Sequence, residues 1–281
     1  MQARDTDADW ELIARVQPYF GVLARPEFRT ESIDDAARAR FFESGRGDIG
    51  QAIDVIRAHL DPTFAPAAAT DFGSGAGRLT LAMAAYAGHV VGVDVAPAMR
   101  DLAAEQAAAQ GVGNVEFTDA VPARADWVNS LIVFQHIPPA RGHLLLDELL
   151  ASVTVGGVAS LQFGTHRDRD HLHEVFRDVA LARFDGATMT TLATSEETQL
   201  GDVSMFDYDL GRLASQFVAH GFENLWLEHT YHGGVHGFWI FVRRATVPAP
   251  AGATEDAAPA VVPASEGSRV RRWLGRDRDR S

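Results

Sequence analysis

The sequence predicts an α/β protein with a doubly wound, seven-stranded sheet that is mostly parallel and has an antiparallel last strand. From residue 68 onward, short apolar runs alternate with segments of helical periodicity, the pattern of a sheet covered by helices on both faces. The first run, 68–72, leads through three alternate glycines directly into a helical pattern. The last two runs are joined by His232-Gly233-Gly234, which predicts an antiparallel hairpin rather than one more parallel strand.

Residues 1–62 precede this alternation and are expected to form a helical N-terminal extension. The motif Ser32-Ile33-Asp34-Asp35 is typical of a helix start, and Gly45 and Gly47 are expected to end the helix that follows it. The other helices of this region are expected at 9–16 and 49–60.

Residues 63–245 carry the alternating pattern and are expected to form one domain. A polar stretch, 165–204, is expected to be an insertion after the fifth strand, with one helix over 170–184. The strands are expected at 68–72, 89–94, 114–118, 128–134, 157–163, 223–229 and 236–243, and the helices near 77–87, 97–110, 140–152 and 208–220.

Residues 246–281 are expected to be a disordered linker followed by an arginine-rich tail, because large apolar side chains are scarce there. The segment 269–280 places its arginines around Trp273 and Leu274. Such a segment could make a weak contact with an acidic partner or an anionic membrane surface, or it could have no partner.

The composition excludes several classes of function. The formal net charge of −13 argues against a nucleic-acid binder that depends on phosphate contacts. The absence of cysteine excludes disulfides, thiolate metal sites and cysteine nucleophiles. No apolar run approaches the roughly 18 residues of a membrane span, and residues 1–10 lack the apolar segment of a secretory signal. The expected location is therefore the cytoplasm.

The most informative segment is the turn after the first strand, Asp71-Phe72-Gly73-Ser74-Gly75-Ala76-Gly77-Arg78. Glycines in such a turn let backbone N–H groups approach a polar or anionic ligand closely. The spacing is G-x-G-x-G, and Arg78 stands where a dinucleotide-binding loop would have its third glycine. A second acid, Asp94, ends the next strand, where a carboxylate can accept hydrogen bonds from both ribose hydroxyls.

These features resemble the first two motifs of class I S-adenosylmethionine-dependent methyltransferases. The resemblance implies the Rossmann-like methyltransferase fold, with S-adenosylmethionine as the cofactor. It implies that the glycines form the loop under the methionine part, that Asp71 holds the ammonium group, that Asp94 binds the ribose, and that Asp119 accepts from the adenine amino group. The implied cofactor residues are Asp71, Gly73, Ser74, Gly75, Gly77, Asp94, Val95, Met99, Asp119, Ala120, Phe134 and Gln135.

The candidate catalytic residue is His136, directly after the fourth predicted strand. Ligands of such sheets bind outside the carboxyl ends of the strands, so His136 could remove a proton from a methyl acceptor. It could equally brace its loop. Beside it, Phe134 and Gln135 are implied to line the floor beneath the sulfonium. The resemblance also implies that the N-terminal helices form a lid over the cofactor.

Three further sets of side chains leave alternatives open. In the lid, Arg25 or Arg29 could pair with the cofactor carboxylate or an acidic acceptor, whereas its aromatic residues could simply be core. The late histidines, His229, His232 and His236, could face the acceptor or be ordinary turn residues. The segment 166–174 mixes imidazoles and carboxylates, but its spacing does not place two histidines on one helix face, so no metal is expected.

The implied activity is methyl transfer to an oxygen or nitrogen of a small-molecule or glycoside acceptor. The acceptor class is reached by elimination, because the segment after the fourth strand matches neither an adenine- or glutamine-methylating motif nor the paired-glutamate loop of protein arginine methylation. Two alternatives remain open: an NAD-dependent oxidoreductase or nucleotide-sugar enzyme, and a non-catalytic methyltransferase-like subunit that binds a partner.

Overall fold

The computed structural model of the chain describes residues 6–168, 179–184, 189–193 and 205–246. The chain divides into two compact units, Met1–Pro248 and Ala249–Ser281. The second unit lies outside the described residues, as does nearly all of the predicted linker and tail. The fold described below is therefore that of the first unit.

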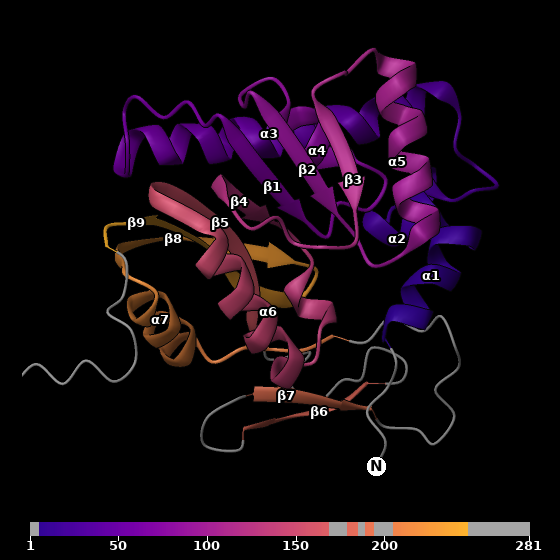
Figure 1. The fold of residues 1–281 in the computed structure, drawn as a ribbon. Helices are drawn as coiled ribbons and strands as arrows, with labels where there is room; N and C mark the ends of the chain where they lie inside the picture. Colours follow the sequence, from indigo (N-terminus) through magenta and orange to yellow (C-terminus); the bar gives the residue numbers. More distant parts are fainter. Residues whose placement is uncertain (1–5, 169–178, 185–188, 194–204, 247–281) are drawn as a thin grey trace, which may run out of the picture. The chain divides into compact units, whose positions relative to one another are not determined.

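A single seven-stranded sheet forms the centre of this unit (Figure 1). Its spatial order is β3-β2-β1-β4-β5-β9-β8, and only the last strand in the chain, β9, runs antiparallel to its neighbours. The predicted fold class is therefore confirmed. The strands are β1 (Ala68–Phe72), β2 (His89–Val93), β3 (Val115–Thr118), β4 (Ala125–Ser130), β5 (Val153–Arg167), β8 (Phe222–His232) and β9 (Val235–Arg244).

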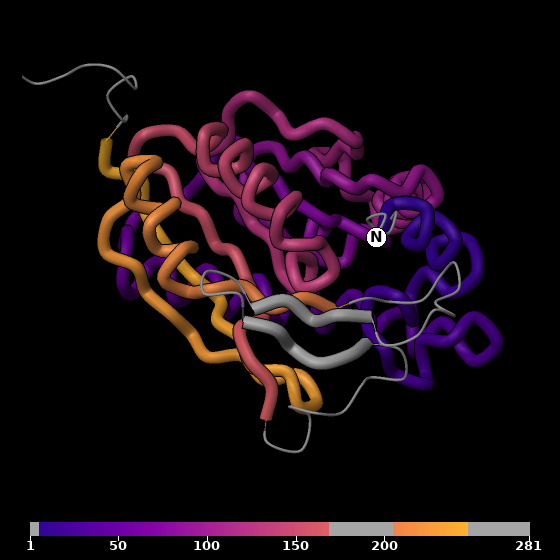
Figure 2. Tube along the Cα trace, turned by 90° about the horizontal axis from the view of Figure 1, so that it is seen from below, coloured from indigo at the N-terminus to yellow at the C-terminus, as the bar shows by residue number. Residues whose placement is uncertain are grey.

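Helices cover both faces of the sheet, α3 and α4 on one and α6 and α7 on the other (Figure 1). Seen from below, α6 and α7 lie side by side (Figure 2), where Gln216 of α7 donates a 3.1 Å hydrogen bond to the His143 carbonyl of α6. The helices are α1 (Thr6–Val16), α2 (Pro18–Val22), α3 (Asp35–His59), α4 (Arg78–Met83), α5 (Pro97–Gln110), α6 (Pro139–Ser152) and α7 (Leu210–Ala219), with short 3₁₀ turns at Pro26–Phe28 and Phe134–His136.

Two apolar cores result, one on each face of the sheet. Trp127 and Phe241 pack with Ile53 of α3 on the first face. Phe163 and Phe217 belong to the cluster on the second face. Strands buried on both faces explain why their sequences read as continuous apolar runs rather than alternating ones.

The prediction that Gly45 and Gly47 end a helix is wrong, because α3 runs without interruption from Asp35 to His59. Its N-cap is Asp34, whose carboxylate accepts a 2.7 Å hydrogen bond from the Ala37 N–H. Gly45 is needed for packing. A Cβ at this position would lie 2.3 Å from the carbonyl oxygen of Arg78, at the start of α4.

This close approach predicts the effect of Gly45→Ala. We expect a loss of about 1–3 kcal/mol in the free energy of unfolding, because α3 or α4 must shift to admit the methyl group. Urea denaturation measures this. Gly50→Ala is the matched control: it lies in the same helix with no atom within 4 Å of its Cβ, and should gain up to about 1 kcal/mol from helix propensity. Equal effects of the two substitutions would contradict the packing role.

The predicted helix over 170–184 is wrong in its last part. Residues Val179–Phe184 form strand β6, which pairs antiparallel with β7 (Met189–Ala193) in a separate two-stranded sheet. The remainder of the predicted helix lies outside the described residues. The side chains of the pair are likewise not described.

Candidate active site

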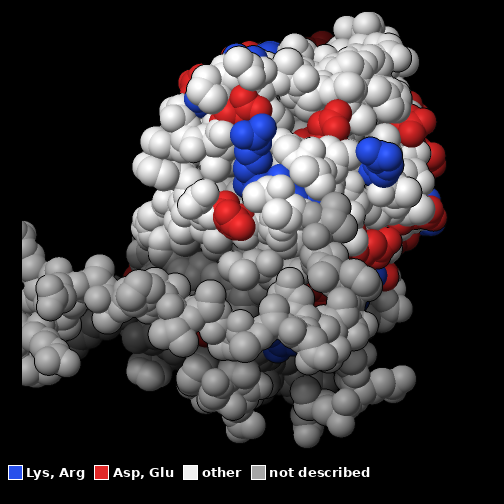
Figure 3. Space-filling view, turned by 60° about the vertical axis from the view of Figure 1, so that its left-hand side comes forward, with Lys and Arg blue, Asp and Glu red and all other residues white. Residues whose placement is uncertain are grey.

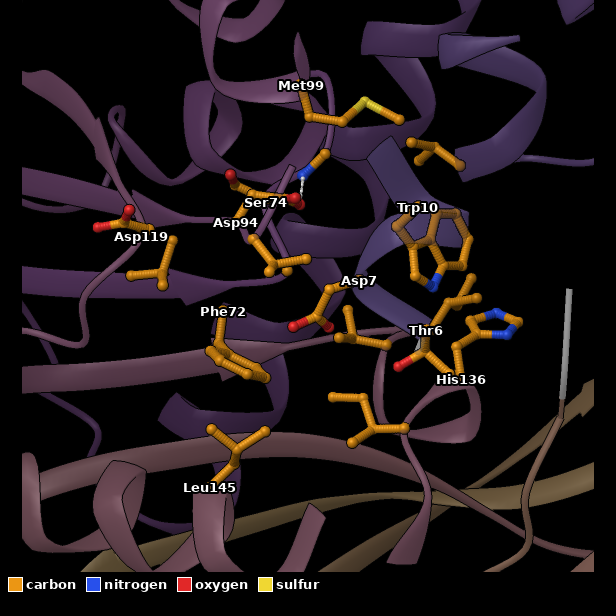
Figure 4. A pocket seen from close by; sticks show the side chains of 18 of the residues that line it. Thr6, Asp7, Trp10, Phe72, Ser74, Asp94, Met99, Asp119, His136 and Leu145 are labelled. Carbon is orange, nitrogen blue, oxygen red and sulfur yellow. Dashed lines mark hydrogen bonds between the residues drawn. The ribbon is translucent and has the colours of Figure 1, made fainter. Parts of the chain in front are cut away.

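A cavity of about 240 Å³ lies at the carboxyl edge of the sheet, beyond the ends of β1, β2 and β4. Figure 4 shows side chains from its wall, with Asp119 on the left, Asp94 and Ser74 near the centre, and Trp10 and His136 on the right. Of the predicted cofactor residues, the structure brings to this wall Gly73, Ser74, Gly75, Asp94, Val95, Met99, Asp119 and Ala120. It does not bring there Asp71, Gly77, Phe134 or Gln135.

The glycine-rich loop closes the cavity on the side of β1. The N–H groups of Gly73 and Ser74 donate to the Val93 carbonyl at 2.7 and 3.0 Å, which ties the loop to β2. Gly73 has a φ of +77°, and a Cβ there would lie 2.3 Å from Val133. Only glycine fits this position, because both the backbone conformation and the space exclude a side chain.

Asp94 connects the loop to the turn after β2. One of its carboxylate oxygens accepts a 2.8 Å hydrogen bond from the Gly75 N–H (Figure 4), and the other accepts one of 2.9 Å from the Ala96 N–H. Burial raises the pKa of the Asp94 carboxyl, while these two backbone donors act to lower it. Each carboxylate oxygen keeps a further lone pair for another donor.

Asp71 does not reach the cavity. It is 1% exposed, and its carboxylate accepts hydrogen bonds from the Thr80 hydroxyl at 2.6 Å and from the Asn129 amide at 3.2 Å. Burial raises the pKa of Asp71, opposed by these two bonds and by the charge of Arg78. Asp71 therefore braces β1 against α4 and β4 from behind the loop.

The fourth strand begins and ends earlier than the predicted 128–134, which changes the floor of the cavity. Strand β4 ends at Ser130, and Ile132 adopts a left-handed φ of +64°. Phe134 then points into the core, where its ring packs 4.5 Å from that of Phe163. The cavity is lined instead by Leu131, Ile132 and Val133. The sequence gives no signal for this turn, because all these residues continue an apolar run.

The cavity is also lined by Met99, Ala120 and Val121 and by the acid Asp119. The Asp119 carboxylate lies 3.7 Å from the guanidinium of Arg100 on α5. An acid and three apolar side chains can accept a flat, amino-bearing ring.

The N-terminal helices contribute residues that the sequence did not single out. Thr6, Asp7 and Trp10 of α1 line the cavity. Asp7 forms an ion pair of 2.5 Å with Arg141 of α6, and the Trp10 ring packs edge-on against His136 with ring centroids 5.1 Å apart. Helix α1 is thereby tied to the opposite wall.

Other predicted lid residues lie elsewhere. Tyr19, Phe41 and Phe42 belong to a buried cluster, so their interpretation as core is the one that the structure bears out. Neither Arg25 nor Arg29 lines the cavity. Arg29 instead lies over the Phe20 ring, 4.3 Å from its centroid.

His136 lines the cavity at the start of the α6 wall. Its Nε2 atom lies 3.1 Å from the side-chain amide nitrogen of Gln135. Gln135 is itself 4% exposed, and its carbonyl oxygen accepts from the Phe206 N–H at 2.6 Å. Contacts from two sides therefore fix the His136 ring.

Two of the late histidines, His229 and His236, form a cluster with His166 on β5, β8 and β9. His229 Nε2 lies 3.0 Å from His236 Nδ1, and the His166 and His236 rings stack 4.6 Å apart. None of them lines the cavity. Over the part of the chain that the structure describes, no group of three possible ligands is placed to hold a metal ion. No described helix is long and apolar enough to cross a membrane.

Comparisons with known proteins agree with this geometry. Residues 69–157, from β1 to the start of β5, match a family model described as a methyltransferase domain. No match is found among curated proteins.

Solved structures share the fold across most of the chain. Magnesium protoporphyrin IX methyltransferase (ChlM) from Synechocystis PCC 6803 with bound S-adenosylhomocysteine gives a TM-score of 0.56 at 15% identity, covering 84% of this chain and 99% of that one. Its structure with bound S-adenosylmethionine gives 0.52 at 14% identity, covering 86% and 99%. The DhpI–S-adenosylhomocysteine complex gives 0.51 at 16% identity, covering 89% and 100%. The resemblance inferred from the glycine-rich loop and the two acids is confirmed at the level of domain and fold.

Proposed function

We propose that this chain, which carries a class I S-adenosylmethionine-dependent methyltransferase domain, transfers a methyl group to an oxygen or nitrogen of a small-molecule acceptor. One observation carries the proposal: a single cavity joins two walls of different chemistry. The glycine-rich loop and Asp94 form one wall, and Trp10 and His136 belong to the other. A cofactor on the first wall would present its reactive group to an acceptor on the second.

The residues of the first wall fit S-adenosylmethionine. Asp94 keeps lone pairs on both carboxylate oxygens for the ribose hydroxyls, although the oxygens already accept from Gly75 and Ala96. Asp119 and Met99 also line the cavity, and the Asp119 carboxylate can accept from an adenine amino group. The two ends of the cofactor would thus meet different residues of one continuous surface.

When bound, the cofactor supplies an already activated methyl group, so the protein has to orient the acceptor and exclude water. Ile137 and Leu145 give the acceptor wall an apolar surface. The ion pair between Asp7 and Arg141 holds α1 across the cavity from α6, which supports the proposal that the N-terminal helices act as a lid.

His136 is the group proposed to take the acceptor proton. We expect His136→Gln to lower kcat by about 100-fold or more while the Kd of S-adenosylhomocysteine stays unchanged, since general-base catalysis typically contributes this much. Steady-state assays with an acceptor that the protein methylates measure kcat, and calorimetric titration measures the Kd. An unaltered kcat would mean that His136 braces its loop and that the acceptor needs no base.

A small acceptor fits the charge of the protein. The net charge is −13, and on the face shown in Figure 3 the positive and negative side chains of the described residues are interspersed rather than gathered into a basic patch. A polyanionic nucleic acid would find little to bind there. The charge of Asp7 on the acceptor wall is balanced by Arg141, and the further acid Glu148 favours an uncharged or cationic small molecule as the acceptor.

The test is calorimetric titration with S-adenosylhomocysteine, with NAD as the control. Micromolar binding of the first ligand alone supports the proposal and leads to a screen of small-molecule acceptors. Binding of NAD alone would restore the oxidoreductase alternative. Binding of S-adenosylhomocysteine without turnover on any acceptor would favour the non-catalytic subunit.

A further inference from the structure

His143 lies buried in the contact between α6 and α7, and the proposed site does not use its imidazole. The residue is 3% exposed and does not line the cavity. The same helix, however, supplies Arg141, Leu145 and Glu148 to the cavity wall. The contact that packs α6 against α7 therefore also helps to hold this wall in place.

The side chain of Gln216 on α7 decides which nitrogen of His143 carries the hydrogen. Its amide nitrogen donates to the His143 carbonyl oxygen at 3.1 Å and to the Asp147 carboxylate at 3.0 Å. Both amide hydrogens are thereby used, so the amide oxygen is the atom that is bonded to His143 Nδ1. An amide oxygen can only accept, so Nδ1 is protonated and Nε2 of the neutral ring is not.

The surroundings of the ring offer nothing to the second nitrogen. His143 Nε2 is buried and has no hydrogen-bond partner among the described residues. The Tyr208 ring packs against the imidazole with centroids 5.4 Å apart, but its hydroxyl already donates to the Ile137 carbonyl at 2.7 Å. A proton added at Nε2 would create a buried, positively charged N–H without an acceptor. The contact therefore fits the neutral ring and disfavours the imidazolium ion.

The charged groups around the ring do not reverse this preference. Burial lowers the pKa of His143, and the positive charge of Arg212 on α7 acts in the same direction. The hydrogen bond to Gln216 and the carboxylates of Asp147 and Asp209 oppose the shift. Asp147 is 49% exposed, so solvent screens its charge, and Asp209 caps α7 by accepting from the Arg212 N–H at 2.7 Å.

We propose that the contact of His143 and Asp147 with Gln216 is an acid-sensitive latch, closed by the neutral His143 ring and opened by its protonation. Opening would let water accept the new N–H, and it would loosen the part of the cavity wall that α6 carries. The folded-state pKa of His143 lies below its unfolded value of about 6.5. The stabilisation is therefore fully present above the unfolded-state pKa and is lost as the pH falls toward the folded-state pKa.

Hydrogen exchange of the backbone amides of α7 tests the latch. We expect their protection factors, corrected for the intrinsic exchange rate, to fall as the pH is lowered from about 6.5 to about 5.5. One proton linked to opening lowers protection by up to about 10-fold per pH unit. The amides of α5, which does not contact His143, should keep their protection over the same range.

Two variants show whether His143 is the group that titrates. His143→Asn offers an amide nitrogen in place of the Nδ1 donor to Gln216 but takes up no proton in this range, so the fall in protection should disappear. His220→Gln is the matched control in the same contact. His220 Nε2 lies 2.9 Å from the Asp147 carboxylate, so protonation there leaves no charge without a partner, and the fall should remain.

Several results would overturn the latch: protection of α7 that does not change with pH, an equal fall in α5, or a fall that persists in His143→Asn. If His143→Asn does not fold, NMR titration of the wild-type ring decides. A hydrogen on Nδ1 and a pKa below the ordinary value would support the latch, whereas a hydrogen on Nε2 of the neutral ring or an ordinary pKa would overturn it.

Discussion

Replacing Asp94 with alanine is expected to weaken binding of S-adenosylhomocysteine by about 100-fold. The carboxylate is proposed to accept hydrogen bonds from both ribose hydroxyls, and hydrogen bonds to a charged group are worth about 1.5–3 kcal/mol each. We therefore expect the free energy of binding to fall by ~3 kcal/mol, which corresponds to the 100-fold change in Kd. Asp94 also accepts from Gly75 and Ala96, which makes it part of the frame of the loop. Calorimetric titration of the variant measures the change in Kd.

The control for this substitution is Asp94→Asn. It keeps the size and one carbonyl acceptor but loses the charge, so its affinity should fall between those of the wild type and the alanine variant. Thermal unfolding of both variants shows whether the fold around the glycine-rich loop is kept when the Asp94 carboxylate is lost. An alanine variant that folds and binds S-adenosylhomocysteine as the wild type does would show that Asp94 is not the ribose acceptor.

Replacing Arg167 with methionine is expected to lower the free energy of unfolding by about 3–5 kcal/mol at neutral pH. Arg167, the last residue of β5, donates to both oxygens of Asp207 at 3.2 and 3.3 Å, and the two side chains are 5% and 0% exposed. Without the guanidinium, the Asp207 carboxylate would be left as an uncompensated buried charge. Urea denaturation measures the loss.

The pH dependence of this loss has a definite sign. Burial raises the pKa of Asp207 and Arg167 opposes that effect, so removing Arg167 raises the folded-state pKa further above its unfolded value. The contribution of Asp207 to the free energy of unfolding of the variant is therefore fully present below its unfolded-state pKa, and it is lost as the pH rises through its folded-state pKa. The deficit of Arg167→Met should therefore be larger at pH 8 than at pH 5.

Two controls test whether the buried charge is the cause. The double variant Arg167→Met/Asp207→Asn should recover part of the lost stability, because no charge is left behind. Arg46→Met removes one partner of an ion pair whose side chains are 53% and 70% exposed, and it should cost less than about 1 kcal/mol. A deficit for Arg167→Met that neither varies with pH nor recovers in the double variant would point to lost packing instead.

The sequence predicted those parts of the fold whose signals are local. Strand β1 and helix α5 have their predicted bounds, because an apolar run before a glycine turn and a Pro97 start with a Gly111 end are complete within one segment. The positions of Gly73 and Asp94 on the cavity wall followed from the same local pattern.

The sequence could not predict features that depend on distant contacts. Asp7 and Arg141 are 134 residues apart, and nothing in either segment indicates that they meet across the cavity. Gly45 was interpreted as a helix breaker, because the sequence does not show that the Arg78 backbone packs against it. The family resemblance implied that Asp71 holds the ammonium group of the cofactor, whereas Thr80 and the distant Asn129 hold its carboxylate in the interior.

The turn after β4 places one strained residue, Ile132, where it serves both the cavity wall and the core. Ile132 is β-branched and sits in a left-handed conformation that costs on the order of 1–3 kcal/mol, yet its side chain lines the cavity and its N–H is fixed by Gln162 at 3.1 Å. Glycine would release that strain and also remove part of the wall. Glycine would also lose the packing of Ile132 against the core on the α3 face, so relief of the backbone strain alone does not make it the more stable residue here.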